Sequence, residues 1–216
     1  MKSYKTVYAY GEGELNINKS RFIGYATPVE SEEDAVSFIE KIRKKHWNAT
    51  HNVPVYIIGE DMTLQRYSDD GEPSGTAGVP VLEMLKKEGI TNICVVMTRY
   101  FGGVKLGTGG LVRAYTQTAK AALEAAGVVE KSVYTVMDCE MDYHFHGKIR
   151  NHLMDRPEII VGETVYTDKV IATLYLPPDI LDAFKNDLVE WTSDQVTIVI
   201  HEDIYLTTKG GKVYNG

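Results

Sequence analysis

The feature that most constrains this chain is an apolar strand that leads through a glycine-rich loop into a long amphipathic helix. The predicted strand 92–98 is built on an uninterrupted apolar run, which is typical of a strand covered on both faces. Five glycines lie in the connection over 99–110. Apolar residues then recur at spacings of three and four from Leu111 to Ala126, and Gly127 ends the predicted helix. This strand, loop and helix must belong to one folded domain.

The rest of the first half alternates strand-like and helix-like segments. The further strands predicted there are 21–28, 53–59 and 63–67. One helix is predicted to begin at Ser31, which is a capping residue followed by three acids in the first turn. A second helix carries Pro80 in its first turn and ends at Gly89.

From about residue 132 the pattern changes to strand, helix, strand, strand, helix, strand. Strands are predicted near 134–142, 158–166, 169–176 and 196–205, and helices near 145–155 and 179–191. This order is the split βαβ, or ferredoxin-like, pattern. The sequence therefore predicts an α+β protein of two domains, residues 1–132 and a ferredoxin-like (βαββαβ) domain over 133–208, with a flexible tail over 209–216.

The formal net charge of −7 is unevenly distributed. Residues 1–132 hold 16 Lys and Arg against 16 Asp and Glu, whereas residues 133–216 hold 7 against 14. All of the excess acidity lies in the second half, so a local basic patch in the first half is compatible with the total charge.

Signals for membranes and disulfides are absent from the sequence. Its longest apolar runs are far shorter than a membrane span, and no apolar core of a signal peptide follows the first five residues, so we expect a cytoplasmic protein. Cys94 and Cys139 lie in apolar strand-like segments, which predicts buried thiols. We predict no cofactor.

The glycine-rich loop carries the main candidate site. Glycines permit positive φ and a close approach to a ligand, and free amides at a helix start attract anions. Three cations surround the loop, and two aromatic residues offer faces on which RNA bases stack. The predicted site residues are Arg99, Tyr100, Phe101, Gly102, Gly103, Lys105, Gly107, Thr108, Gly109, Gly110 and Arg113. The alternative is that the aromatics are core residues and the glycines only permit a tight turn.

Two further segments supply accessory candidates. Asp69, Asp70 and Glu72 lie in a stretch rich in turn-forming residues, which suits either a divalent cation or a structured loop. Their spacing does not match an EF-hand, so the loop is favoured. His46 and His51 have no third ligand nearby, which favours a hydrogen-bonded structural role, and we predict no metal site.

Several of these motifs together resemble the IMPACT family, in its bacterial branch, across about residues 15–127. The matching motifs are Lys19-Ser20-Arg21-Phe22-Ile23, His46 with Ala49-Thr50-His51-Asn52, Asp69-Asp70-Gly71-Glu72-Pro73 with Thr76-Ala77-Gly78, and Arg99-Tyr100-Phe101-Gly102-Gly103 followed by Gly107-Thr108-Gly109-Gly110-Leu111-Val112-Arg113-Ala114-Tyr115. Residues from about 133 resemble the carboxyl-terminal domain of the same branch.

The resemblance implies a first domain like domain 2 of ribosomal protein S5, with a mixed sheet backed by helices. It implies a second domain similar to the last domain of elongation factor G. Eukaryotic relatives regulate translation by binding a partner of a stress kinase through an additional amino-terminal domain, so their mechanism does not transfer directly.

These observations favour a translation-associated regulator that binds RNA or the ribosome through the glycine-rich site, with the acidic second domain available to a protein partner. No catalytic residue is predicted, because no nucleophile with an evident base is present. One alternative is a phosphotransferase, or another nucleotide-dependent enzyme, that holds a triphosphate on the glycine loop and Mg²⁺ on the acidic loop. Another is a protein-interaction adaptor.

Overall fold

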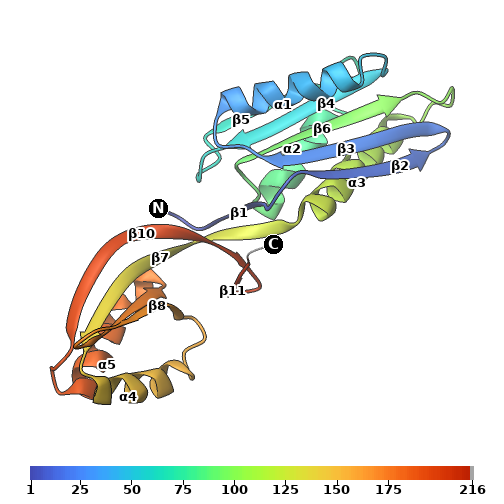
Figure 1. Ribbon diagram of the computed structural model, residues 1–216. Coiled ribbons are helices and arrows are strands. Elements are labelled where there is room, and N and C mark those ends of the chain that lie inside the picture. Colours follow the sequence, from blue (N-terminus) through green and yellow to red (C-terminus); the bar gives the residue numbers. More distant parts are fainter. Residues whose placement is uncertain (215–216) are drawn as a thin grey trace. The chain divides into compact units, whose positions relative to one another are not determined.

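The computed structural model describes residues 1–214, which divide into two compact units (Figure 1). The unit called here the first domain comprises Ser3–Lys131 together with Tyr214. The second domain comprises Ser132–Val213 together with Met1–Lys2. No helix in the described part of the chain is both long enough and apolar enough to cross a membrane.

The first domain contains the strands and helices that the sequence predicts, preceded by two strands that the sequence did not predict. Its elements are β1 (Tyr4–Val7), β2 (Gly11–Ile17), β3 (Ser20–Pro28), α1 (Glu32–Lys45), β4 (His51–Ile58), β5 (Leu64–Tyr67), α2 (Gly78–Glu88), β6 (Ile93–Tyr100) and α3 (Thr108–Ala126). Ser31 caps α1 as expected, because its side chain accepts a hydrogen bond from the backbone N–H of Asp34 and the Asp34 carboxylate accepts one from the backbone N–H of Ser31. Strand β1 pairs with the start of β7 (Val128–Met141).

The main sheet of the first domain has the strand order β2-β3-β6-β4-β5. All of its neighbouring strands are antiparallel, which corrects the mixed sheet implied by the family resemblance. Strands β3 and β4 run in the same direction, but β6 lies between them, so they share no ladder. Helix α1 connects β3 to β4.

Strand β6 lies at the centre of a three-layer arrangement. One apolar cluster joins α1 to one face of the sheet, and a second joins α2 and α3 to the other face. Every residue from Ile93 to Arg99 is buried, which confirms the expectation of a strand covered on both faces. Burial also holds Cys94 as a neutral thiol, because removal from water raises its pKa.

The second domain confirms the ferredoxin-like prediction. Its elements are β7, α4 (Tyr143–Leu153), β8 (Ile160–Tyr166), β9 (Val170–Leu176), a 3₁₀ turn (Pro178–Ile180), α5 (Leu181–Thr192), β10 (Thr197–Lys209) and β11 (Lys212–Val213). The strand order is β11-β10-β7-β9-β8, and an apolar cluster that includes Ile149 of α4 and Phe184 of α5 packs on the sheet. Within the segment predicted as a flexible tail, β11 pairs with the end of β10, while residues 215–216 lie outside the described residues.

Candidate functional site

Four connections of the first domain meet at one end of its main sheet. Residues 18–19 join β2 to β3, and the start of β3 pairs with the end of β6, where Arg21 lies opposite Tyr100. His51, the first residue of β4, lies opposite Arg99 of the same strand. This end of the sheet is called the loop edge below. It consists of residues 18–19, 46–50, 68–77 and 101–107, together with the first two turns of α3.

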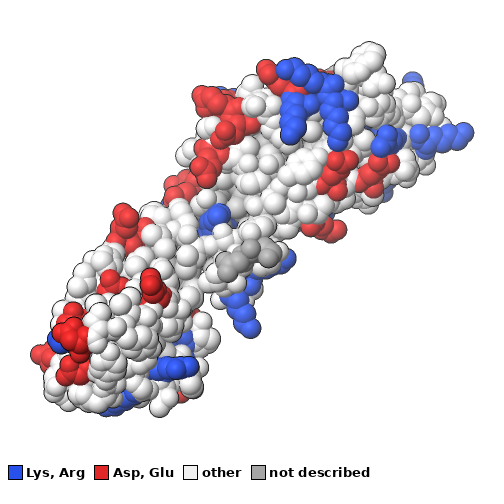
Figure 2. All heavy atoms as spheres, viewed as in Figure 1, with Lys and Arg blue, Asp and Glu red and all other residues white. Residues whose placement is uncertain are grey.

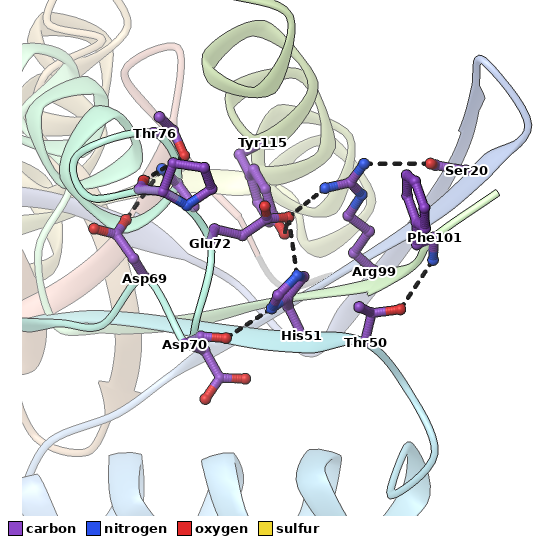
Figure 3. Close-up of polar contacts among 12 residues, drawn as sticks. Ser20, Thr50, His51, Asp69, Asp70, Glu72, Thr76, Arg99, Phe101 and Tyr115 are labelled. Carbon is purple, nitrogen blue, oxygen red and sulfur yellow. Dashed lines mark hydrogen bonds and ion pairs between the residues drawn. The ribbon is translucent and has the colours of Figure 1, made fainter. Parts of the chain in front are cut away.

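A buried polar cluster is centred on Glu72 at the loop edge (Figure 3). Arg99 Nη1 donates to Glu72 Oε1 over 2.6 Å, and the Tyr115 hydroxyl donates to the same oxygen over 2.7 Å. His51 Nε2 lies 3.6 Å from that oxygen, while its Nδ1 is 2.7 Å from the carbonyl oxygen of Asp70. Burial and the bond to Glu72 raise the pKa of Tyr115, so this hydroxyl is a neutral donor. The cluster joins β4, β6 and α3 to the 68–77 loop.

The guanidinium of Arg99 is packed against two aromatic rings. Its Cζ lies 5.2 Å from the ring centroid of Phe22 and 5.3 Å from that of Phe101, which is within cation–π range. Nη2 donates to Ser20 Oγ over 3.4 Å, but Nε is buried without a hydrogen-bond partner in the described part of the chain. The sequence predicts Arg99 as a cation facing an anionic ligand; the structure instead turns its charge inward, toward Glu72.

The carboxylates of the acidic loop bind separate partners. Asp69 accepts hydrogen bonds from the backbone N–H groups of Ala77 and Gly78, where α2 begins. Asp70 accepts one from the backbone N–H of Asn52. In residues 1–214 no three His, Cys, Asp or Glu side chains gather into a group that could hold a metal ion.

His46 connects two tyrosines on the α1 side of the sheet. Its Nε2 is 2.5 Å from the Tyr25 hydroxyl, and its Nδ1 is 2.8 Å from the Tyr100 hydroxyl. Burial, followed by the charges of Lys45 and Arg21, lowers the pKa of His46, so the ring favours the neutral form that can accept from one tyrosine and donate to the other. Tyr100 is half-buried, its hydroxyl is held by this bond, and Arg21 Cζ lies 6.0 Å from its ring centroid.

The glycines of the loop serve different purposes. A Cβ on Gly102 would come within 1.9 Å of the carbonyl oxygen of Lys19, so only glycine fits where the two connections cross. Gly103 and Gly107 adopt positive φ of 83° and 71°. Helix α3 then starts without a side-chain cap, so the N–H groups of its first turn, which includes Gly109 and Gly110, have no partner within the helix.

Exposed cations and aromatic rings gather at the same edge. Lys19, Lys105 and Arg113 are exposed and form no ion pair with any described residue. Phe101 is 47% exposed and Trp47 is 83% exposed. In the view of Figure 2, Lys and Arg atoms lie over α1 and at the end of the first domain where β2 turns into β3.

Two hollows adjoin Leu106 at the loop edge. The larger, of about 420 Å³, is lined by Thr50, His51, Glu72, Pro73, Arg99, Phe101, Lys105, Leu106, Gly107, Thr108 and Leu111. The smaller, of about 250 Å³, is lined by Ile17, Asn18, Leu106, Gly110, Arg113, Ala114 and Gln117. The structure therefore brings most of the predicted site residues together around these hollows, with Arg99 on the inner wall and Lys105 and Arg113 at the surface.

Sequence reasoning missed several contributors to the site. Ser20 binds Arg99 and the backbone N–H of Gly102, and Thr50 Oγ1 accepts from the N–H of Phe101. Tyr115 has the helical spacing of a core residue, so nothing in the sequence predicts that its hydroxyl donates a hydrogen bond to Glu72. Trp47 lies in a short connection, and only the structure shows how far it is exposed.

Comparison with known proteins places the chain among relatives that share both domains. The Impact N-terminal domain matches residues 18–123, and a domain of unknown function, DUF1949, matches residues 139–195. The IMPACT family member YvyE of Bacillus subtilis is 45% identical over 206 residues, which are 95% of this chain and 94% of that protein. The chain belongs to the IMPACT family. The Impact N-terminal domain spans all four connections of the loop edge.

Solved structures resemble this IMPACT family member to different extents. A crystal structure described as a hypothetical protein is 31% identical, covers 94% of this chain and 98% of its own, and has a TM-score of 0.58. A structure titled as the two-domain translational regulator Yih1 is 27% identical and covers 55% of this chain and 47% of its own. Its TM-score is 0.40, which is too low to extend its fold or its role to this chain.

Proposed function

We propose that this protein is a translation-associated regulator that binds RNA, free or within the ribosome, through the loop edge of its first domain. The observation that supports this most is the meeting of Lys19, Lys105 and Arg113 with the exposed rings of Phe101 and Trp47 at one end of the sheet. These residues come from separate segments of the chain, and none of the three cations is neutralised by a described acid.

The chemistry of this edge suits single-stranded RNA. Unpaired Lys and Arg side chains bind phosphates and release counterions, and the uncapped first turn of α3 adds backbone N–H donors. Exposed aromatic rings stack on bases that are not stacked in a duplex. Loops and single strands therefore fit the edge better than a continuous helix.

The phosphotransferase alternative receives no support from the site. Its magnesium loop would need the carboxylates of Asp69, Asp70 and Glu72 to converge, and each is bound to a different structural partner. Binding, rather than group transfer, is the activity that the arrangement supports.

The test is a triple variant, Lys19→Ala, Lys105→Ala and Arg113→Ala, in the full chain. Filter binding to single-stranded RNA and co-sedimentation with ribosomes should both weaken strongly at low salt. Lys87→Ala is the matched control, because Lys87 is an exposed cation near the carboxyl end of α2, away from the loop edge. Retention of both activities by the triple variant, with folding intact by circular dichroism, would refute the proposal.

A further inference from the structure

The second domain contains a cavity that the RNA-binding proposal does not use. It has a volume of about 280 Å³ and lies between α4 and the strands β8 and β9. Its walls are mostly apolar. The lining residues are Met141, His146, Ile149, Arg150, Leu153, Val161, Thr164, Tyr166, Ala172 and Leu174.

A bulge in β8 shapes one wall of this cavity. Val161 lies opposite Leu174, and Thr164 lies opposite Ala172, so two intervening residues of β8 face one of β9. Because of this extra residue, Val161 and Thr164 both lie on the face of the sheet that carries the buried side chains of Leu174 and Ala172. Without the bulge, the strict alternation of a strand would have placed Val161 and Thr164 on opposite faces. Val161 lines the cavity yet remains 52% exposed, which shows that α4 leaves this edge of the sheet uncovered.

One unpaired cation lies on the wall of the cavity. Arg150 on α4 is exposed and forms no ion pair with any described residue. It is the only Lys or Arg among the lining residues, which include no Asp or Glu. Residues 133–216 hold 14 acids against 7 bases, so a cavity wall with a cation and no acid differs in charge from the domain as a whole. The rings of Tyr166 and His146 also line the cavity, and their centroids are 5.6 Å apart.

We infer that the second domain binds a small organic acid, a carboxylate joined to a compact apolar body. The apolar body occupies the cavity, and the carboxylate binds the guanidinium of Arg150, which offers a forked pair of donors. An apolar cavity of about 150 Å³ holds benzene, so this one accommodates a ring with a short chain. The charge of the lining disfavours two other ligand classes. A polyanion would have only one Lys or Arg to pair with, and an organic cation would have no Asp or Glu to pair with.

The first experiment uses the full chain and three probes that share one apolar body. These are 3-phenylpropionate, 3-phenylpropan-1-ol and 3-phenylpropylamine, titrated against the ¹⁵N-labelled protein by NMR. The carboxylate should shift the amide signals of α4 and β8 in a saturable way, the alcohol should bind more weakly, and the amine should bind least. Equal affinity for all three, or no saturable shift with the carboxylate, would overturn the inference.

Two variants separate the charge from the cavity. Arg150→Gln should weaken binding of the carboxylate about tenfold or more and leave the alcohol unchanged, because it removes a charge-assisted hydrogen bond. Lys185→Gln, at a partly exposed cation on α5 outside the cavity, is the control and should change neither. Val161→Trp should block binding of all three probes by filling the cavity, and the amide spectrum checks that this variant is folded.

The proposed site would be refuted if Arg150→Gln bound the carboxylate as the control does, or if Val161→Trp still bound the carboxylate with normal affinity. RNA binding by the loop edge is a separate measurement, so either proposal can fail alone.

Discussion

Arg99 and Glu72 form an ion pair of 2.6 Å in which the two side chains are only 5% and 3% exposed. The pair links the end of the central strand β6 to the 68–77 loop, and Tyr115 extends the link to α3 through the same carboxylate oxygen. It therefore holds together the segments that carry the exposed cations and aromatic rings. Its role is to build the loop edge, while residues outside it are available to a ligand.

Arg99→Met should destabilise the protein by about 3–5 kcal/mol, because it leaves Glu72 buried without its cation. Urea unfolding followed by circular dichroism measures the change. Lys86→Met is the control, since its pair with Glu83 lies at the surface, where Glu83 is 61% exposed, and such pairs contribute little. Equal stability losses in the two variants would contradict a structural role for the buried pair.

Gly102→Ala should destabilise the first domain, and Gly109→Ala should not. A Cβ on Gly102 meets the Lys19 carbonyl oxygen at 1.9 Å, so one of the two connections must move. A Cβ on Gly109 meets no atom within 4 Å, and alanine is a better helix former than glycine. Thermal melts of both variants provide the comparison. A lower melting temperature for Gly109→Ala than for Gly102→Ala would show that the crossing is not tight.

Phe101→Ala should weaken binding of single-stranded RNA by about 1–3 kcal/mol through loss of stacking. Because the side chain is uncharged, the slope of log affinity against log salt should stay the same, whereas Lys105→Ala should reduce it by about 0.7. Filter binding over a series of salt concentrations measures both. Val104→Ala changes an exposed neighbour in the same loop and should bind like the wild type. A Phe101→Ala variant that matches it would exclude stacking on this ring.

The stability of the wild type should fall as the pH is lowered through the unfolded pKa of His46, near 6.5. Burial lowers the pKa of His46 in the folded state, so below this pH the unfolded chain binds more protons than the folded chain and is stabilised relative to it. His46→Gln removes this contribution. Urea unfolding of both proteins from about pH 8 to about pH 5 should show a shallower pH dependence for the variant. Parallel curves would mean that His46 titrates alike in both states.

Periodicity and turn chemistry were sufficient to predict most of the fold. The apolar run at 93–97, the cap at Ser31 and the stop at Gly127 each act through neighbours close in sequence, and each predicted element is found. The ferredoxin-like order of the second half follows from the same signals. The relative direction of the strands in the first sheet could not be predicted from these local signals, because it depends on which strands become neighbours although they lie far apart in the sequence.

The sequence by itself determined the elements, the uneven distribution of charge and the location of the glycine-rich segment, since these depend on local composition and spacing. Only the tertiary structure decided which cations remain available. Arg99 and Lys105 belong to the same motif, yet one is buried against Glu72, 27 residues away, and the other is exposed. The physical reason is that a cation's role depends on the acids that folding brings to it and on how much water it loses, and neither quantity is local in the sequence.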